Sequence, residues 1–276
     1  MIVSCIQLNP QTDLKENVII ALKYISEAAK KGSEIVVLPE MFTYMGEESH
    51  RHKTKSKIGE GVFKELQNAA KENKVILICG SHSEEIKDNP NKVFNTCLTF
   101  DKNGEMISTY RKLHLFNLID RNGKALYCES NSFEYGKSPE GYSFETKEGN
   151  WKALNIICYD LRFPEIIRNN EKMKTAPFDI IFVTAAFTWQ TGKDHWEILL
   201  RARAIENQCY VIACNQTGEF LNGQKRNYGN SMIIDPWGNI VAKLDEEVGI
   251  LQAEIKKENV IESRNRLPAL ADRKMY

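Results

Sequence analysis

The chain lacks the long apolar runs and the excess of one charge that mark several classes of protein. No apolar stretch approaches the roughly 18 residues that span a bilayer, and residues 1–10 carry no basic segment of a signal peptide. Lys and Arg total 37, as do Asp and Glu, so a net charge of zero gives no overall attraction to nucleic acid or anionic membrane. We therefore expect a cytoplasmic protein with neither nucleic-acid nor membrane partners.

Cysteine is present, but not in the pattern of a disulfide framework. The seven cysteines are odd in number and most stand in apolar, strand-like runs, which favours reduced core thiols. The basic stretch 51–57 contains no aromatic residues, which favours a solvated loop over a phosphate track. His50, just before this stretch, and His52, within it, lack nearby cysteine or acid ligands at a spacing suited to a metal. We expect no metal site.

Alternation of strand-like and helical segments predicts an α/β fold. Helical periodicity is found in residues 14–31, 61–73 and 193–207. Strand-like runs are expected at residues 2–8, 34–38, 75–80, 93–100, 151–158, 179–184, 209–215, 231–235 and 249–255.

We expect a single domain over residues 1–276, because no interdomain linker or repeat is present. Two long polar connections, residues 43–59 and 117–140, are the best candidates to border a site. The end of the chain, from about residue 264 to 276, looks like a tail that needs a surface to pack on. A partner subunit is one candidate for that surface.

Cys158 ends the apolar run 154–157 and precedes Pro164, a residue suited to the first turn of a helix. A strand-to-helix junction exposes a side chain at the sheet edge, where backbone N–H groups and the helix dipole favour a thiolate. Free cysteine is more often a small buried hydrophobe. A catalytic role for Cys158 therefore depends on partners elsewhere in the chain.

Two charged residues provide such partners. Glu40 closes the apolar run 35–39, and Lys112 lies among apolar and aromatic residues in YRKLHLF. Such a lysine either reaches for water or is held as a charged donor in a pocket. A catalytic thiol needs a base, and none of the five histidines has support beyond its residue type. An acid, an ammonium and a thiol together indicate a site more strongly than any one alone.

Three segments resemble the Glu, Lys and Cys motifs of the nitrilase superfamily of carbon–nitrogen hydrolases: LPEMF (38–42), YRKLHLF (110–116) and ICYDLRFPE (157–165). Residues 186–211 and 227–242 also resemble this family, so the resemblance covers nearly the whole chain. With CESNS at 128–132, they indicate the amidase branch that holds deaminated-glutathione amidases and omega-amidases. Leu154 and Ile156 stand where relatives often carry glycine, a departure that affects local packing rather than chemistry.

The resemblance implies a four-layer α-β-β-α sandwich that forms a homodimer or a larger homo-oligomer, without metal or organic cofactor. By position, it assigns Glu40 as general base, Lys112 as the cation that stabilises the oxyanion and Cys158 as nucleophile. Glu129 matches the family's second glutamate, held near the lysine. We expect burial to bring the pKa of Glu40 near the working pH.

Three further residues are candidates for binding the substrate. The backbone N–H of Tyr159 is expected to share the oxyanion with the lysine. Arg162 can bind a substrate carboxylate through two hydrogen bonds, or else pair with Glu165 or Asp160. Phe187 borders a strand end and is a candidate pocket wall, although aromatics at such places are more often core residues.

The predicted function is an amidase that hydrolyses the terminal carboxamide of a small carboxylate-bearing metabolite through a cysteine thioester and releases ammonia. Deaminated glutathione is the favoured substrate, followed by 2-oxoglutaramate and succinamate. Hydrolysis of a nitrile or an N-carbamoyl amino acid is the alternative within the same fold. A non-enzymatic scaffold would be expected to have lost a triad position, and all three are intact.

Overall fold

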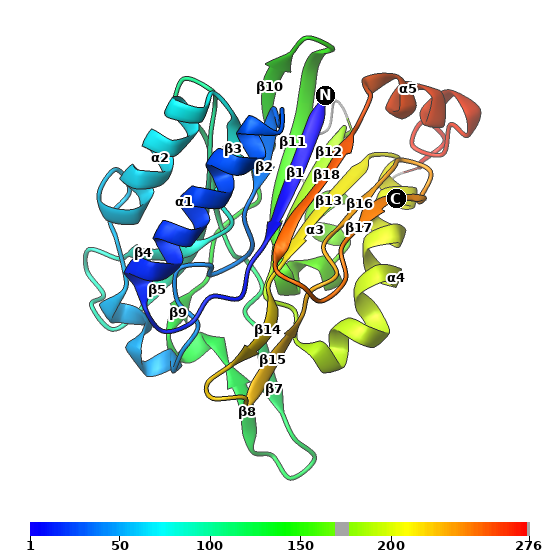
Figure 1. Cartoon of the computed structure of the whole chain (residues 1–276). Coiled ribbons are helices and arrows are strands. Elements are labelled where there is room, and N and C mark those ends of the chain that lie inside the picture. Colours follow the sequence, from blue (N-terminus) through cyan, green and yellow to red (C-terminus); the bar gives the residue numbers. More distant parts are fainter. Residues whose placement is uncertain (169–176, 275–276) are drawn as a thin grey trace.

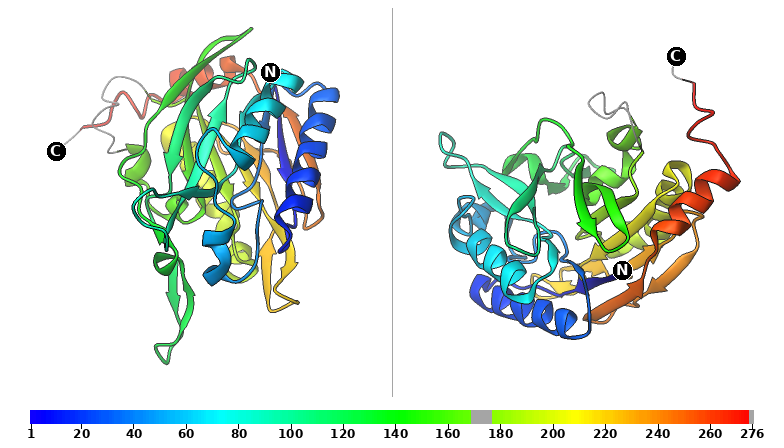
Figure 2. Two further views of the ribbon diagram at one scale, coloured as in Figure 1. Left: turned by 90° about the vertical axis from the view of Figure 1, so that its left-hand side faces the viewer. Right: turned by 90° about the horizontal axis from the view of Figure 1, so that it is seen from above.

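The computed structural model describes residues 1–168 and 177–274 and contains two β-sheets stacked face to face. Helices cover the outer face of each sheet, which gives four layers in the order α-β-β-α (Figure 1; Figure 2). The predicted α/β sandwich is therefore confirmed.

The first sheet has eight strands in the order β18-β1-β2-β3-β5-β4, with β6 and β9 also paired to β5. β1, β2 and β3 are parallel, and the other pairs are antiparallel except β5 with β9. Its strands are β1 (Ile2–Gln7), β2 (Ile35–Val37), β3 (Ile76–Ile78), β4 (His82–Glu85), β5 (Val93–Phe100), β6 (Met106–Arg111), β9 (Phe133–Glu134) and β18 (Gly249–Glu254).

The second sheet has six strands in the order β10-β11-β12-β13-β16-β17, of which β11, β12 and β13 are parallel. Its strands are β10 (Tyr142–Thr146), β11 (Gly149–Ile157), β12 (Ile180–Ala185), β13 (Tyr210–Asn215), β16 (Met232–Ile234) and β17 (Ile240–Lys243). Two hairpins lie outside both sheets: β7 (Asn117–Ile119) with β8 (Ala125–Cys128), and β14 (Thr217–Phe220) with β15 (Lys225–Tyr228). Both project from the same end of the molecule (Figure 1).

The α-helices are α1 (Leu14–Lys30), α2 (Gly61–Asn73), α3 (Glu165–Arg168), α4 (Trp189–Asn207) and α5 (Lys257–Arg266). Three short 3-10 helices are η1 (Glu48–Lys53), η2 (Glu129–Asn131) and η3 (Cys158–Arg162). Asp13 begins α1, because its carboxylate accepts a hydrogen bond of 3.0 Å from the backbone N–H of Glu16. The first sheet is covered by α1 and α2, and the second by α4 (Figure 1).

Strand alternation explains why the central strands are apolar on both faces. In β2, Ile35 and Val37 pack in the core between the two sheets. Val36 and the following Leu38 pack with residues of α1 and α2 in a second core on the outer face. The apolar run at residues 35–38 is thus explained, because successive side chains of this strand pack into a different core on each face.

The nine strands expected from apolar runs are all present, with ends that differ by one or two residues. Residues 101–105 connect β5 with β6, and residues 235–239 connect β16 with β17. The expected runs did not include the other nine strands, which are β4, β6, β7, β8, β9, β10, β14, β15 and β17. One of these strands, β4, contains His82, which is fully buried and whose ring bonds to Thr43 and Ser56.

The described part of the predicted tail packs on its own chain through a few contacts. Gln208 donates a hydrogen bond of 2.6 Å to the carbonyl of Leu267, and Arg273 donates one of 3.0 Å to the carbonyl of Arg168. Residues 275–276 of the tail lie outside the described residues. Packing on a partner subunit stays a prediction.

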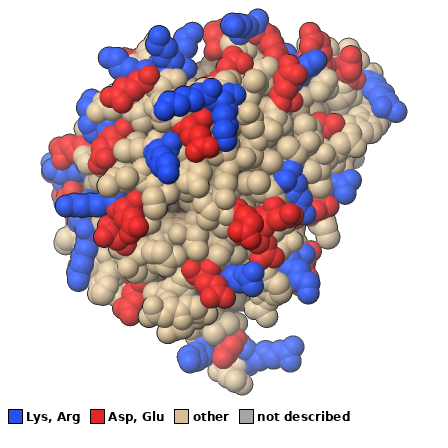
Figure 3. All heavy atoms as spheres, viewed as in Figure 1, with Lys and Arg blue, Asp and Glu red and all other residues tan. Residues whose placement is uncertain are grey.

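Charged residues of both signs are interspersed on the face shown in Figure 3. This mixed surface agrees with the formal net charge of zero. Among the helices that the structure describes, none is long and apolar enough to cross a membrane.

Candidate active site

Two of the predicted residues stand at strand ends where the backbone takes an unusual conformation. Glu40 follows β2, and the next residue, Met41, has a φ of 47°. Cys158 follows β11 directly and has a φ of 48°. Non-glycine residues seldom adopt this left-handed region, which costs of order 1–3 kcal/mol, and such residues cluster at functional sites. Both candidate residues thus stand where a strand ends in a strained turn.

Lys112, directly after β6, joins the two glutamates. Its ammonium lies 2.8 Å from Glu40 Oε1 and 2.8 Å from Glu129 Oε2, and the Lys112 residue is only 1% exposed. Gly136 lies close beside this lysine, since its N–H donates to the Lys112 carbonyl at 2.8 Å. A Cβ on Gly136 would come within 2.1 Å of the Arg111 carbonyl, so only glycine permits this approach.

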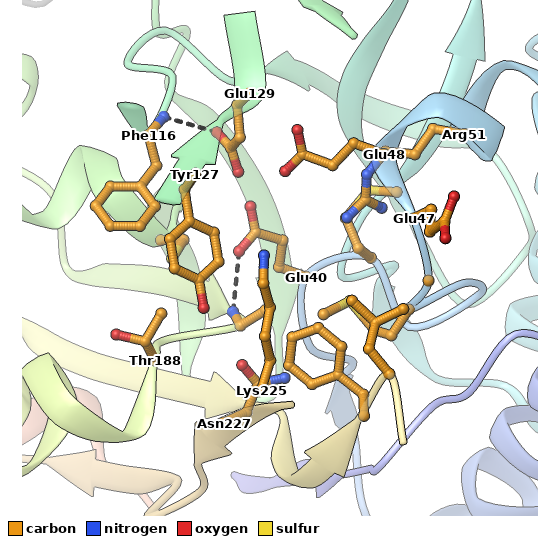
Figure 4. Close-up of a pocket in the computed structure, with 17 residues that line it drawn as sticks. Glu40, Glu47, Glu48, Arg51, Phe116, Tyr127, Glu129, Thr188, Lys225 and Asn227 are labelled. Atoms are coloured by element: carbon orange, nitrogen blue, oxygen red, sulfur yellow. Dashed lines mark hydrogen bonds between the residues drawn. The ribbon is translucent and has the colours of Figure 1, made fainter. Parts of the chain in front are cut away.

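Each glutamate has further donors that fix its position. Glu40 accepts hydrogen bonds of 2.9 Å from Asn95 and 2.9 Å from the backbone N–H of Ala186. Glu129 accepts one of 2.8 Å from the backbone N–H of Phe116. The two dashed lines in Figure 4 mark these backbone bonds. Both carboxylates are therefore held as acceptors on either side of one ammonium.

The electrostatics of this cluster differ from what the sequence predicts. Burial and the nearby charge of Glu40 raise the pKa of the Cys158 thiol well above its ordinary value, although Lys112 opposes this. The helix after the thiol is a single short 3-10 segment, too little to favour a thiolate. The expectation that the strand-to-helix junction favours a thiolate was therefore wrong, because the pKa of the Cys158 thiol is raised rather than lowered.

The prediction for Glu40 was also wrong in direction. Burial disfavours its charge, but the ion pair with Lys112 and hydrogen bonds from the Cys158 thiol and the Ala186 N–H hold the pKa of Glu40 below its usual range. Burial raises the pKa of Glu129, aided by Glu40 and opposed by Lys112. Burial alone would lower the pKa of Lys112, but the two glutamates raise it well above its usual range. The lysine therefore stays an ammonium.

Asp160 ties the lysine segment to the cysteine turn, a role that sequence reasoning missed. Its carboxylate accepts a hydrogen bond of 2.6 Å from the Tyr110 hydroxyl and one of 3.0 Å from the Ile157 N–H. It also accepts from the backbone N–H of His114 at 2.9 Å and lies 2.8 Å from the His114 ring nitrogen. These bonds place Lys112 and Cys158 in a fixed relation.

A pocket opens over this cluster. It has a volume of about 900 Å³, open mouth included, and Glu40, Glu129 and Cys158 all line it. Most of its other walls come from the segment that runs from Met41 into the helix η1 and from the hairpin β14–β15, with Tyr127 of the hairpin β7–β8 added (Figure 4). The expected convergence of acid, ammonium and thiol is therefore observed, with Lys112 behind the glutamates that face the cavity.

A smaller recess of about 240 Å³, open mouth included, adjoins the pocket and contains the other predicted residues, Tyr159, Arg162 and Phe187. The Arg162 guanidinium lies 5.1 Å from the centre of the Phe187 ring and 5.9 Å from that of Tyr159. Phe187 is buried, so it serves as both core and wall.

Arg162 does not pair with the acids considered as alternatives. Asp160 is occupied by the donors described above, and no ion pair of Arg162 with Glu165 exists in the described ranges. Its guanidinium donates only a bond of 3.3 Å to the His195 ring. The guanidinium is thus available to a ligand in the recess.

Sequence reasoning also missed two cations in the larger pocket. Arg51, assigned to a solvated basic loop, is buried in η1 and lines the cavity. Lys225, in β15, also lines this cavity (Figure 4). Within residues 1–168 and 177–274, no group of three or more His, Cys, Asp and Glu side chains is arranged to hold a metal ion.

The fold and the site agree with comparisons to known proteins. Residues 2–265 match the carbon-nitrogen hydrolase family. The chain is 36% identical over 270 residues to a deaminated glutathione amidase of Synechocystis, covering 98% of this chain and 97% of the relative. It is 35% identical over 271 residues to a 2-oxoglutaramate amidase of Bacillus subtilis, covering 98% and 96%.

A solved structure, the NitFhit protein of Caenorhabditis elegans, superposes with a TM-score of 0.87 at 33% identity. That match covers 99% of this chain and 65% of the longer one. The chain therefore belongs to the carbon–nitrogen hydrolase family and is a hydrolase that acts on carbon–nitrogen bonds.

Proposed function

We propose that this hydrolase is an amidase that acts on a small carboxylate-bearing amide through a thioester on Cys158. The observation that carries the proposal is the arrangement of Glu40 and Glu129 on either side of the Lys112 ammonium, beside the thiol of Cys158. Relatives named as amidases at 35–36% identity support the reaction type.

The first half of the reaction forms the thioester. Glu40, ionised because its pKa is lowered, takes the thiol proton as the sulfur attacks the amide carbon. The high pKa of the thiol means that proton transfer accompanies attack rather than precedes it. The Lys112 ammonium and the backbone N–H of Tyr159 stabilise the negative charge on the amide oxygen. Glu40 then protonates the leaving nitrogen, and the carbon–nitrogen bond breaks.

The second half releases the acid. Glu40, again a carboxylate, takes a proton from water, whose oxygen attacks the thioester carbon. The carbon–sulfur bond then breaks and the sulfur recovers a proton from Glu40. Glu129 acts as a positioning residue in both halves, because its two bonds of 3.0 and 2.8 Å to Lys112 hold the ammonium in place.

Arg162 supports a substrate with a carboxylate on its acyl side. Its guanidinium lies in the recess next to Cys158, and planar guanidinium groups match carboxylate geometry. Deaminated glutathione, 2-oxoglutaramate and succinamate all carry such a carboxylate.

The leaving group differs among these candidates, and one expectation needs correction. In 2-oxoglutaramate and succinamate the amide is terminal, so hydrolysis releases ammonia. In deaminated glutathione the amide joins a 2-oxoglutaryl group to cysteinylglycine, so cleavage releases that dipeptide instead. An ammonia assay alone would therefore overlook the favoured substrate.

The test is a substrate panel read by chromatography of both products. Purified protein is incubated with the three candidates, with glutamine and with a simple nitrile. We expect turnover of at least one carboxylate-bearing amide, no turnover by Cys158→Ala, and retained turnover by the matched control Cys128→Ala. Cys128 is the other partly exposed cysteine among the seven. Full activity of Cys158→Ala, or hydrolysis of the nitrile alone, would refute the proposal.

A further inference from the structure

The larger pocket contains a buried cation that the proposed chemistry does not use. Arg51 is only 8% exposed, and its Nε has no hydrogen-bond partner among the residues that the structure describes. Its Nη1 donates a single long bond of 3.4 Å to the Tyr44 carbonyl. The guanidinium otherwise lies against aromatic rings, 5.4 Å from the centre of Phe133 and 6.0 Å from that of Tyr44. A buried donor without an acceptor is unfavourable, so a ligand that supplies one would be bound.

Lys225 enters the same pocket from β15. Its ammonium lies 3.8 Å from the centre of the Tyr127 ring, and burial lowers the pKa of Lys225, although Glu48 opposes this. Glu47 and Glu48 also line the pocket. In the part of the chain that the structure describes, however, neither acid lies within ion-pair distance of Arg51 or Lys225. Two cations thus remain available on the walls of this pocket (Figure 4).

The position of Cys158 divides the site into two parts. The recess with Arg162 and the pocket with Arg51 share only four lining residues, which are Phe116, Cys158, Ala186 and Thr188. A substrate carbonyl held at the sulfur therefore extends in two directions. The recess is much the smaller of the two, so we assign it to the shorter acyl part of the substrate and the larger pocket to a bulkier leaving group.

We propose that Arg51 and Lys225 form a second anion subsite, which binds a carboxylate on the leaving group of the substrate. The inference rests on the proposed function and specifies its substrate class. The acyl part carries one carboxylate for Arg162, and the amide nitrogen carries a substituent that ends in another. Cysteinylglycine in deaminated glutathione is such a leaving group, whereas a primary carboxamide leaves the subsite empty.

The test changes the substrate before it changes the protein. Native enzyme is compared on deaminated glutathione and on the same compound with its terminal glycine as the carboxamide. We expect kcat/KM to be about 10- to 100-fold higher for the acid, the range for a hydrogen bond to a charged group. Arg51→Gln and Lys225→Met should each reduce this preference towards unity.

Arg226→Met is the matched control, because Arg226 adjoins Lys225 on β15 but pairs with Glu246 and does not line the pocket. It should keep the preference for the acid. Equal kcat/KM for acid and carboxamide in native enzyme, or an undiminished preference in both pocket variants, would overturn the subsite.

The subsite and the proposed function can fail separately. If the enzyme hydrolyses 2-oxoglutaramate but has equal kcat/KM for deaminated glutathione and its glycine carboxamide, the subsite alone is overturned. If native protein hydrolyses no amide, the proposed function fails, and calorimetric titration of Cys158→Ala still decides on the subsite. Binding of the acid at least about tenfold tighter than the carboxamide supports it, and equal binding rejects it.

Discussion

Replacement of Lys112 by methionine tests whether the buried charge cluster is arranged as described. The ammonium lies 2.8 Å from the buried carboxylate of Glu40 and 2.8 Å from the half-buried carboxylate of Glu129, so Lys112→Met leaves both without their shared counter-charge. Removal of one partner from a buried ion pair typically destabilises by about 3–5 kcal/mol. At about 2–4 °C per kcal/mol for a chain of this size, thermal unfolding should shift down by about 6–20 °C. Activity should fall at least about 100-fold with the oxyanion donor.

Lys112→Met should also change the way in which the stability of the protein depends on pH, in a direction that the structure determines. In the native protein Lys112 holds the pKa of Glu40 below its usual range. Without the lysine, burial and repulsion between the two acids raise both carboxyl pKa values above their unfolded values. Folding of the variant then takes up protons, so its stability relative to native protein rises as pH falls through those pKa values.

The assay is differential scanning calorimetry of native and variant protein between about pH 7.5 and about pH 5. The difference in unfolding temperature between native protein and Lys112→Met should become smaller as pH falls. The double variant Lys112→Met/Glu129→Gln removes one of the two stranded charges and should recover part of the loss at neutral pH. An unfolding temperature within about 2 °C of native protein, or a gap that widens at low pH, would refute this reasoning.

Three further predictions follow from the site. Tyr110→Phe removes a buried 2.6 Å hydrogen bond to Asp160 and should cost about 1–3 kcal/mol in denaturant unfolding; no change would contradict this. The pKa of Glu40 is lowered from the ordinary glutamate value of 4.5, and Glu40 acts as a carboxylate. As pH falls, kcat/KM should therefore decrease only below pH 4.5, and a decrease near pH 6 would argue against Glu40 as the base. Arg162→Gln should raise KM for 2-oxoglutaramate about tenfold or more while changing that for butyramide little; equal changes would exclude carboxylate binding.

The sequence was sufficient for the sandwich and for the position of the reactive cluster. Strands such as β2 and β12 are apolar on both faces, which requires a layer on each side whatever the remaining contacts are. Glu40 and Cys158 follow such strands, so their positions at a sheet edge could be predicted from local pattern. Lys112 was singled out by its apolar and aromatic neighbours, and its role came from the family motifs. Glu129 was found through the family motif alone.

What could not be predicted depends on contacts between distant segments. Arg51 belongs to a basic stretch that is typical of a solvated loop, but it packs against Tyr44 and Phe133 and is buried. Lys225 lies in the polar hairpin β14–β15, and its ammonium packs on the Tyr127 ring of the hairpin β7–β8. The predicted direction of the Glu40 pKa was wrong for the same reason. The sequence does not reveal that Lys112 lies close enough to Glu40 to outweigh the effect of burial.

The central claim is that Cys158 carries the acyl group during hydrolysis of the amide. The most direct measurement is mass spectrometry of protein that is quenched with acid during turnover of deaminated glutathione or 2-oxoglutaramate and then digested. The account predicts a 2-oxoglutaryl adduct on the peptide that contains Cys158 and its absence in Cys158→Ala, which should be inactive. An adduct on another residue, or undiminished hydrolysis by Cys158→Ala, would contradict it.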